Sequence, residues 1–209
     1  MCGRFVLFTD LSRLANSFDI REVRCDYAPL GEVYPGRLIY AVIREEVNRL
    51  VSCRWGLVPS WAQNSPQGKG IINARAETLT EKASFRNIFK RQRCLVVADG
   101  FYEWEKTAGK SIPHYYDLKS GEPFGMAGLY DIRRRTDGSM LRTCTIITTA
   151  SNELIRAVHD RMPAIIPRKD MSAWLDPAMA DAAELLALLR PHPAEVMQDK
   201  RQDTTKISV

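Results

Sequence analysis

Several features that this 209-residue sequence lacks narrow its class before any motif is considered. It has no run of about 18 apolar residues, and its start has no signal-peptide pattern, so neither a membrane span nor secretion is expected. Its five cysteines are odd in number and widely spaced, and no Cys-x-x-Cys pair suggests a zinc ribbon or a disulfide framework. No glycine-rich phosphate loop precedes a predicted helix. We therefore expect a cytoplasmic protein with no metal and no organic cofactor.

Length and composition favour one globular domain. A hydrophobic content of 45% over this length can form a sizeable core, and we expect a single domain over residues 1–194. The polar residues 195–209 predict a flexible tail, and residues 63–70, rich in Gly, Pro, Ser and Asn, predict a flexible loop. The formal charge of +5 is compatible with a polyanionic partner. Part of that excess lies in residues 133–135 and 200–201, whose simpler interpretation is solvated chain.

Strand-type segments predominate along the chain. Five segments are aromatic or β-branched and are bounded by turn residues, which is typical of strands. They cover residues 49–58, 94–104, 114–118, 124–132 and 141–149. The pattern predicts an α+β fold with a largely antiparallel, barrel-like sheet core and flanking helices.

Helical patterns lie between and after these strands. Residues 10–18 and 84–91 are two such segments, and a third begins near Ser151. Asp176 followed by Pro177 is typical of an N-cap and a first helical position, so we expect a longer helix to begin there. Its apolar positions indicate packing against the sheet.

Cys2 is the residue of this sequence with the most distinctive possible reactivity. Removal of Met1 would leave a thiol and a free α-amine on one residue, which together form a 1,2-aminothiol. The amine, with an ordinary pKa of about 7.7 to 8.0, is partly neutral at cellular pH, and a cation such as Arg4 could lower the thiol pKa from about 8.5. The simpler alternative is that Cys2 is an inert small hydrophobe of a first strand.

Two polar or aromatic clusters follow in the first half of the chain. Trp55 and Trp61 flank a glycine and proline turn. Both rings could be core, which we favour for Trp55, whereas Trp61 beside the loop could stack on a nucleobase. Asn73, Arg75 and Glu77 alternate and would share one face of an extended segment. An edge strand with an ordinary ion pair is the alternative.

A carboxylate lies between aromatic residues near a strand end. Glu103 has Tyr102 and Trp104 as chain neighbours, and apolar surroundings raise a carboxyl pKa toward the range useful for proton transfer. Glu105 is expected to face solvent. A salt-bridged strand residue remains the alternative for Glu103.

Only one of the three histidines has chemically interesting neighbours. His159 precedes Asp160 and Arg161, so it could exchange a proton near neutral pH while the guanidinium holds a phosphate. His114 and His192, each beside proline, are expected to be surface residues with no partner.

These motifs in their order resemble those of the SOS response-associated peptidase (SRAP) family. They are Cys-Gly-Arg-Phe at residues 2–5, the tryptophan turn at 55–61, Asn-Ala-Arg-Ala-Glu-Thr at 73–78, Asp-Gly-Phe-Tyr-Glu-Trp at 99–104 and His-Asp-Arg-Met-Pro at 159–163. The resemblance covers about residues 2–167 and a helix beyond them. One departure is Val97, where many relatives have proline.

The resemblance implies a sensor and shield of abasic sites in single-stranded DNA. In the family the mature N-terminal cysteine forms a covalent DNA–protein crosslink with the ring-opened sugar aldehyde and closes to a thiazolidine. The implied catalytic residues are Cys2, Asn73 to orient the N-terminus or sugar, Glu103 to move protons, and His159 to assist sugar-ring opening. The implied DNA-binding residues are Arg4, Arg75 and Arg161 on phosphates and Trp61 against an unstacked base.

Two other functions remain open from the residues alone. An N-terminal-cysteine hydrolase or peptidase would use the amine as a base for the thiol. A non-catalytic single-stranded DNA-binding module would use only the basic and aromatic residues, and Cys2 would then be dispensable. In each DNA-binding case we expect a monomer that contacts backbone rather than base edges and associates with the nucleoid when bound.

Overall fold

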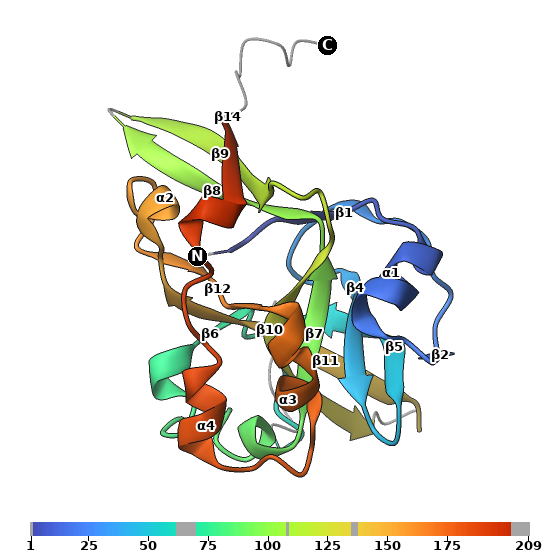
Figure 1. Cartoon of the computed structure of the whole chain (residues 1–209). Coiled ribbons are helices and arrows are strands. Elements are labelled where there is room, and N and C mark those ends of the chain that lie inside the picture. The colour runs from blue at the N-terminus through green and yellow to red at the C-terminus, as the bar shows by residue number, and fades with distance from the viewer. Residues whose placement is uncertain (1, 62–69, 108, 135–137, 202–209) are drawn as a thin grey trace.

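The structure is a computed structural model that describes residues 2–61, 70–107, 109–134 and 138–201 (Figure 1). Its strands are β1 (Phe5–Leu7), β2 (Glu22–Val23), β3 (Gly31–Val33), β4 (Leu38–Arg44), β5 (Asn48–Trp55), β6 (Asn73–Arg75), β7 (Arg93–Ala98), β8 (Gly100–Thr107), β9 (Lys110–Leu118), β10 (Phe124–Arg134), β11 (Met140–Ala150), β12 (Arg161–Pro163), β13 (Ile165–Ile166) and β14 (Met197–Arg201). Its α-helices are α1 (Leu11–Phe18), α2 (Glu153–Arg156), α3 (Met171–Leu175) and α4 (Ala182–Ala187). Its 3-10 helices are η1 (Ala76–Thr78), η2 (Ile88–Lys90), η3 (Arg168–Asp170) and η4 (Ala194–Val196).

The larger sheet closes into a barrel. Its strand order is β12-β11-β10-β7-β4-β5-β2, and β11 also pairs with β5 in parallel, through Thr143 with Arg54 and Cys144 with Trp55. This pairing joins β11, β10, β7, β4 and β5 into a closed ring of five strands. Closure leaves no free edge among these five strands, because each pairs on both sides. The predicted antiparallel, barrel-like α+β fold is confirmed.

A second, antiparallel sheet covers one end of the barrel. Its order is β14-β9-β8-β1-β3, and its strands β8, β9 and β14 lie side by side at the top of Figure 1. Phe5, Phe101 and Tyr116 are fully buried and belong to the same hydrophobic cluster as the barrel residues Cys94 and Cys144. This shared core fixes the second sheet against the barrel. Cys2 lies just before β1 of this sheet, and Glu103 lies on β8.

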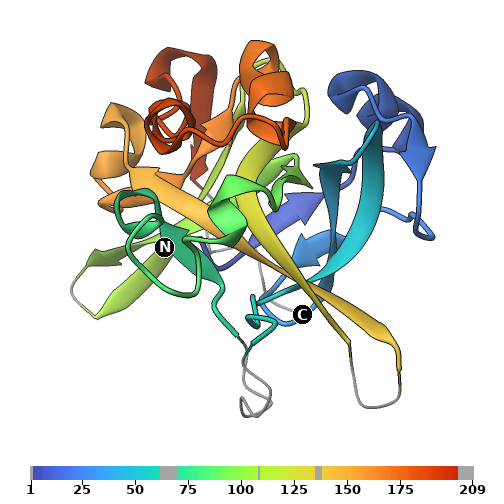
Figure 2. The ribbon, with the colours of Figure 1, turned by 90° about the horizontal axis from the view of Figure 1, so that it is seen from below.

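Helices cover the outside of the barrel. A second cluster joins Leu14 and Phe18 of α1 and Trp174 of α3 to the outward-facing Leu95 and Val97 of β7. Figure 2 shows the helical segments gathered over one side, while the β10–β11 hairpin extends from the other. None of the helices in the described ranges is both long and apolar enough to cross a membrane.

The predicted helices are confirmed in part. Asp10 caps α1 as expected, because its carboxylate accepts the Arg13 N–H at 3.0 Å. The helix expected from Asp176 is wrong: the Asp176 carboxylate accepts the Ala178 N–H in a turn, and α4 begins only after Asp181, which caps it. The segment 84–91 is likewise not one helix, since it consists of turns and the 3-10 helix η2.

The strand predicted over residues 94–104 is interrupted at Asp99. β7 ends at Ala98 in the barrel and β8 begins at Gly100 in the other sheet. The Asp99 carboxylate accepts hydrogen bonds from the backbone N–H groups of Phe8 and Thr9, the latter at 2.9 Å. These contacts tie the crossing point between the two sheets to the end of β1.

The prediction of a flexible tail from residue 195 is wrong for the described residues. β14 pairs with β9 along its whole length, from Met197 opposite Leu118 to Arg201 opposite His114. Met197 is buried in the core cluster. Because successive side chains of a strand point to opposite faces, this largely polar segment can pack one face against the core. Residues 202–209 and most of the predicted loop 63–70 lie outside the described residues.

Gly70 lies at a point where a side chain would not fit. Its φ is +68°, and a Cβ there would come within 2.5 Å of the Gly56 carbonyl oxygen. Gly70→Ala should therefore lower the free energy of unfolding by about 2 kcal/mol, because both the left-handed backbone and the contact oppose it. Urea denaturation would measure this loss. Gly36→Ala, which shares a positive φ but has open space, is the control and should cost less.

Candidate active site

Cys2 is held in place at the start of β1. Its side chain is completely buried in the unprocessed chain. The Asn73 side chain on β6 donates a hydrogen bond from Nδ2 to the Cys2 carbonyl oxygen at 2.9 Å. Asn73 Oδ1 is buried and has no hydrogen-bond partner among the described residues. β6, which pairs with the barrel strand β11, thus positions the N-terminal segment that leads into the other sheet, and one amide acceptor stays available beside it.

The electrostatics of the Cys2 thiol differ from the sequence-based expectation. Burial raises the pKa of the thiol well above its ordinary value, and the nearby Glu103 carboxylate raises it further, against the positive charge of the chain's amino terminus. The expected lowering by Arg4 is wrong. The thiol is therefore protonated at neutral pH in this environment, and a nucleophilic thiolate would need a base to form.

Arg4 is directed to aromatic rings. Its guanidinium carbon lies 5.0 Å from the ring centroid of Tyr34, 5.1 Å from that of Tyr102 and 4.8 Å from that of Trp104. Glu32 is 3.5 Å from its Nη1. These contacts hold the cation in a fixed orientation at the surface of the second sheet, next in sequence to the Cys2 motif. A fixed guanidinium can present its remaining N–H groups to an anion.

Glu103 is a buried carboxyl group poised for proton transfer. It is 2% exposed on β8, and burial raises its pKa to about 7. The Asp160 charge raises this pKa further, and the positive amino terminus lowers it. The predicted rise is confirmed. A group with this pKa is present in both protonation states at neutral pH, so it can accept a proton and return it.

His159 lies between α2 and β12. Its Nδ1 is 2.9 Å from the backbone nitrogen of Arg161 and 2.9 Å from Asp160 Oδ1. The backbone N–H can only donate, so we assign Nδ1 as the acceptor and place the proton of the neutral ring on Nε2. Burial lowers the pKa of His159, and the positive amino terminus lowers it too. A neutral ring with a protonated Nε2 can donate a hydrogen bond from that nitrogen.

Arg161 has a partner already. Its guanidinium makes a two-pronged pair with Glu77 at 2.7 and 2.9 Å and donates to the Thr148 carbonyl at 2.6 Å. This hydrogen bonding holds the pKa of Glu77 below its usual range. The prediction of one extended segment carrying Asn73, Arg75 and Glu77 is wrong beyond Arg75, because β6 ends there and Glu77 lies in the 3-10 helix η1. Arg75 itself is exposed.

Trp61 is the most exposed of the four tryptophans, with 64% of its surface accessible. Trp55 is fully buried, as expected.

Two histidines that were expected to be free surface residues have buried surroundings. His114 is 7% exposed and lies between Asp199 and Glu105, at 2.6 and 3.3 Å. His192 is half-buried, and burial lowers its pKa. The contact of His114 with Asp199 joins residues far apart in the chain, and the burial of His192 results from tertiary packing. Neither could be predicted from the neighbouring residues in the sequence.

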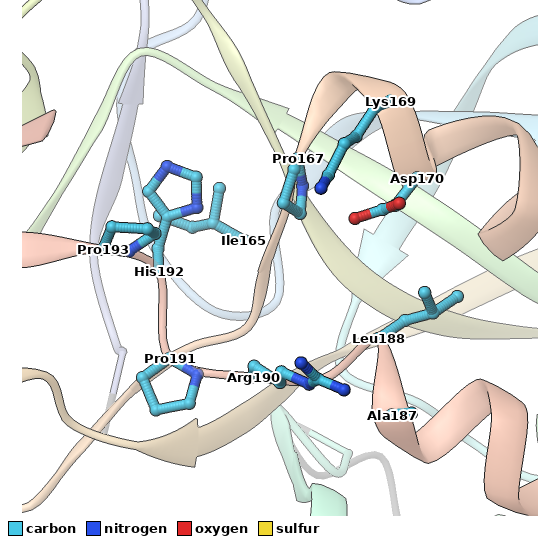
Figure 3. Close-up of a pocket in the computed structure, with 10 residues that line it drawn as sticks. All are labelled: Ile165, Pro167, Lys169, Asp170, Ala187, Leu188, Arg190, Pro191, His192 and Pro193. Carbon is cyan, nitrogen blue, oxygen red and sulfur yellow. The ribbon is translucent and has the colours of Figure 1, made fainter.

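A cavity lies elsewhere in the described part of the chain. It has a volume of about 280 Å³ and lies between the β13–η3 segment and the chain after α4, with His192, Lys169 and Arg190 in its wall (Figure 3). It contains none of the eight predicted site residues. No group of three His, Cys, Asp or Glu side chains among the described residues is arranged to hold a metal ion.

In this fold Cys2 lies beside β6, which pairs with the barrel strand β11, and near the buried Glu103. The model of the SOS response associated peptidase (SRAP) family matches residues 1–204, and the chain belongs to this family. The family resemblance of the motifs is confirmed.

Similar proteins support this assignment. The abasic site processing protein YoqW of Bacillus subtilis (strain 168) is 43% identical over 202 residues, covering 95% of this chain and 90% of the relative. The abasic site processing protein HMCES of Rattus norvegicus is 34% identical over 189 residues, covering 72% and 54%. A crystal structure of a protein from Bacteroides thetaiotaomicron has a TM-score of 0.87 at 27% identity and covers 97% of this chain and 93% of its own.

The Asn73 hydrogen bond gives a direct prediction. Asn73→Ala and Asn73→Asp both remove the donor to the Cys2 carbonyl, and a hydrogen bond of about 1 kcal/mol corresponds to about a fivefold to tenfold loss of correctly placed N-terminus. If Cys2 reacts with DNA, the rate constant for adduct formation should fall by that factor. Thermal unfolding should show little change, and Asn16→Ala on α1 serves as a control that leaves the rate intact.

Proposed function

We propose that this chain recognises abasic sites in single-stranded DNA and forms a covalent thiazolidine crosslink to them through Cys2 after Met1 has been removed. The observation that carries the proposal is the convergence at the N-terminus: Cys2 is tethered by Asn73 and coupled electrostatically to Glu103, a buried carboxyl with a pKa of about 7. The family membership and the names of the relatives, which process abasic sites, point to the same substrate. Crosslinking would shield the lesion during a DNA damage response.

The chemistry needs both nucleophiles of a mature N-terminal cysteine. The neutral α-amine attacks the aldehyde carbon of the ring-opened sugar, and loss of water gives an imine. The thiol then adds to the same carbon, its proton passing to the former imine nitrogen. Two bonds form at one carbon, and the product is a five-membered ring of sulfur, nitrogen and three carbons.

Three residues have roles that follow from their environment. Glu103 takes the proton of the thiol, which burial keeps protonated, and delivers protons to nitrogen and to the leaving hydroxyl. His159, with its neutral ring, donates a hydrogen bond from Nε2 to the sugar-ring oxygen as the ring opens. Asn73 orients the amine or a sugar hydroxyl through its unpartnered Oδ1.

The surrounding residues would hold single-stranded DNA. Arg75 is exposed and close in sequence to Asn73, Arg4 has a fixed orientation, and Trp61 offers an exposed ring for an unstacked base. Arg161 reaches a phosphate if the phosphate replaces Glu77 as its partner. Such contacts recognise the phosphate backbone and the position of the missing base, so the protein needs no sequence-specific contacts to base edges. We infer a monomer acting at the nucleoid, with a lyase-type side reaction if the imine leads to β-elimination.

Intact mass spectrometry tests the proposal. The purified protein should first show a mass without methionine. After incubation with a single-stranded oligonucleotide that carries one abasic site, and without reductant, an adduct stable to denaturation should appear at the summed mass less water. An undamaged oligonucleotide should give none. Methionine removal with no adduct would contradict the proposal and favour amide or peptide hydrolysis as the activity to examine.

A further inference from the structure

His114 lies directly across the sheet from Glu103. The two residues are register partners on β9 and β8, so their side chains point to the same face. That face is the core side, because Phe101 and Tyr116, two residues away on each strand, are fully buried. The His114 ring stacks on Tyr116 with centroids 6.2 Å apart and an interplanar angle of 14°. The imidazole is therefore fixed beside the buried carboxyl of the proposed active site.

Both ring nitrogens of His114 face carboxylates. Nδ1 is 2.6 Å from Asp199 of β14, and Nε2 is 3.3 Å from Glu105 of β8. A neutral imidazole can donate from only one nitrogen, so both contacts can be hydrogen bonds donated by the ring only when both nitrogens carry a proton. The same face of three adjacent strands thus carries Glu103, Glu105 and Asp199 around one histidine.

The C-terminal strand brings the second carboxylate to this place. Asp199 is opposite Tyr116 in the β14–β9 register and reaches His114 diagonally. On the opposite face of the same strand pair, Lys200 binds Asp117 at 2.5 Å. Two separate side-chain contacts therefore attach β14 to β9, one on the face of the active site and one on the opposite face. β14 is the outermost strand of this sheet (Figure 1).

We propose that His114, held by Asp199 of the C-terminal strand, is a positioning residue whose cation sets the charge state of Glu103 in the crosslinking reaction. The effect on crosslinking rests on the proposed function, whereas the placement of His114 beside Glu103 rests on the strand register. Three carboxylates on one sheet face, of which Glu103 is buried, repel one another, and a cation among them favours their ionised forms. With His114 in place, Glu103 is ionised often enough near neutral pH to take the thiol proton.

Other charged groups act on Glu103 from the elements packed around it. They are the Asp160 carboxylate beside β12, the Cys2 thiol on the chain leading into β1, and the positive amino terminus. Glu105, Asp199 and the Tyr116 hydroxyl complete the set on the sheet face. Replacing His114 removes none of these groups, and the Lys200→Gln variant, which loosens β14 on its other face, separates loss of the histidine from loosening of the strand.

Carbon-13 NMR titration of the glutamate carboxyl groups tests this inference without DNA. The Glu103 signal is assigned by its loss in Glu103→Gln. His114→Gln should move the Glu103 titration midpoint upward by about half a unit to one unit, because a neighbouring positive charge is lost. Lys200→Gln breaks the β14 contact on the other face and should leave the midpoint in place. Crosslinking by His114→Gln should show its acid limb displaced by the same amount.

The outcomes separate this inference from the proposed function. An unmoved Glu103 midpoint in His114→Gln, or an equal movement in Lys200→Gln, overturns the role of His114 whether or not the protein crosslinks. A wild-type protein that forms no adduct overturns the proposed function, while the midpoint still decides the charge coupling. If His114→Gln fails to fold, His114→Asn, which shortens the side chain and keeps a donor, gives the same comparison.

Discussion

Replacement of Cys2 by alanine is expected to abolish the DNA adduct completely. The variant keeps the α-amine after methionine removal, since alanine is also small, but it has no thiol to close the ring. An imine can still form, and it hydrolyses on denaturation. Denaturing gel electrophoresis and intact mass measurement should therefore detect no adduct without borohydride, and a trapped adduct should appear when borohydride is added.

A serine at position 2 separates the two bonds of the proposed product. Cys2→Ser keeps the shape and supplies a poorer nucleophile, so the adduct should be a reversible imine or a weak oxazolidine. Cys25→Ser is the matched control, because Cys25 is a half-buried thiol away from the N-terminus and should leave the adduct yield unchanged. A stable, reductant-free adduct in Cys2→Ala would contradict the thiazolidine, and loss of adduct in Cys25→Ser would point to a general need for thiols.

The sequence predicts the sheet elements better than the helices. The strands 114–118, 124–132 and 141–149 appear as parts of β9, β10 and β11, because alternating β-branched and aromatic residues suit both the pleat and the barrel interior. The helix expected at Asp176 fails because an aspartate–proline pair also suits a turn, and the next aspartate, Asp181, provides the cap that the helix uses. Local capping signals do not decide between two nearby candidates.

The tail and His114 show a limit of a different kind. β14 has no hydrophobic run, and its place is fixed by pairing with a strand about 80 residues earlier. His114 and Asp199 are 85 residues apart, so no local pattern could predict their contact. Closure of the barrel by the parallel β11–β5 pair is likewise non-local.

The candidate site residues each stand in a short motif of the sequence. The sequence identified Glu103 from its aromatic neighbours, and burial confirms the raised pKa. The direction of the Cys2 pKa shift was not predictable, because it depends on burial by distant strands and on the approach of Glu103 from β8. The position of Arg4 over Tyr34, which follows β3, and over Tyr102 and Trp104 of β8 also depends on the assembled sheet.

Glu103→Gln is expected to have the second large effect, with opposite signs on activity and stability. Glutamine fits the same space but cannot carry a proton from sulfur to nitrogen, so the crosslinking rate should fall about 10²-fold to 10⁴-fold. In the wild type the rate should fall tenfold per unit below a pH of about 7, where Glu103 becomes protonated. The remaining activity of Glu103→Gln should lose this acid limb. Stopped-time gel assays from pH 5.5 to 9 would measure both.

The stability effect follows from the same shift. The carboxyl pKa rises from 4.5 to about 7 on folding, so the folded protein binds the proton more tightly, and the free energy of unfolding falls as pH rises through this window. At pH 8 the buried charge costs up to about 3 kcal/mol, from a shift of this size. Glu103→Gln should recover much of this cost at pH 8 and little at pH 4, as measured by urea denaturation. Glu184→Gln on α4 is the control, and a destabilised Glu103→Gln at pH 8 would show that the ionised carboxylate is held by contacts stronger than its desolvation. The residue that makes the reaction possible is thus expected to make the fold less stable at the pH where it works.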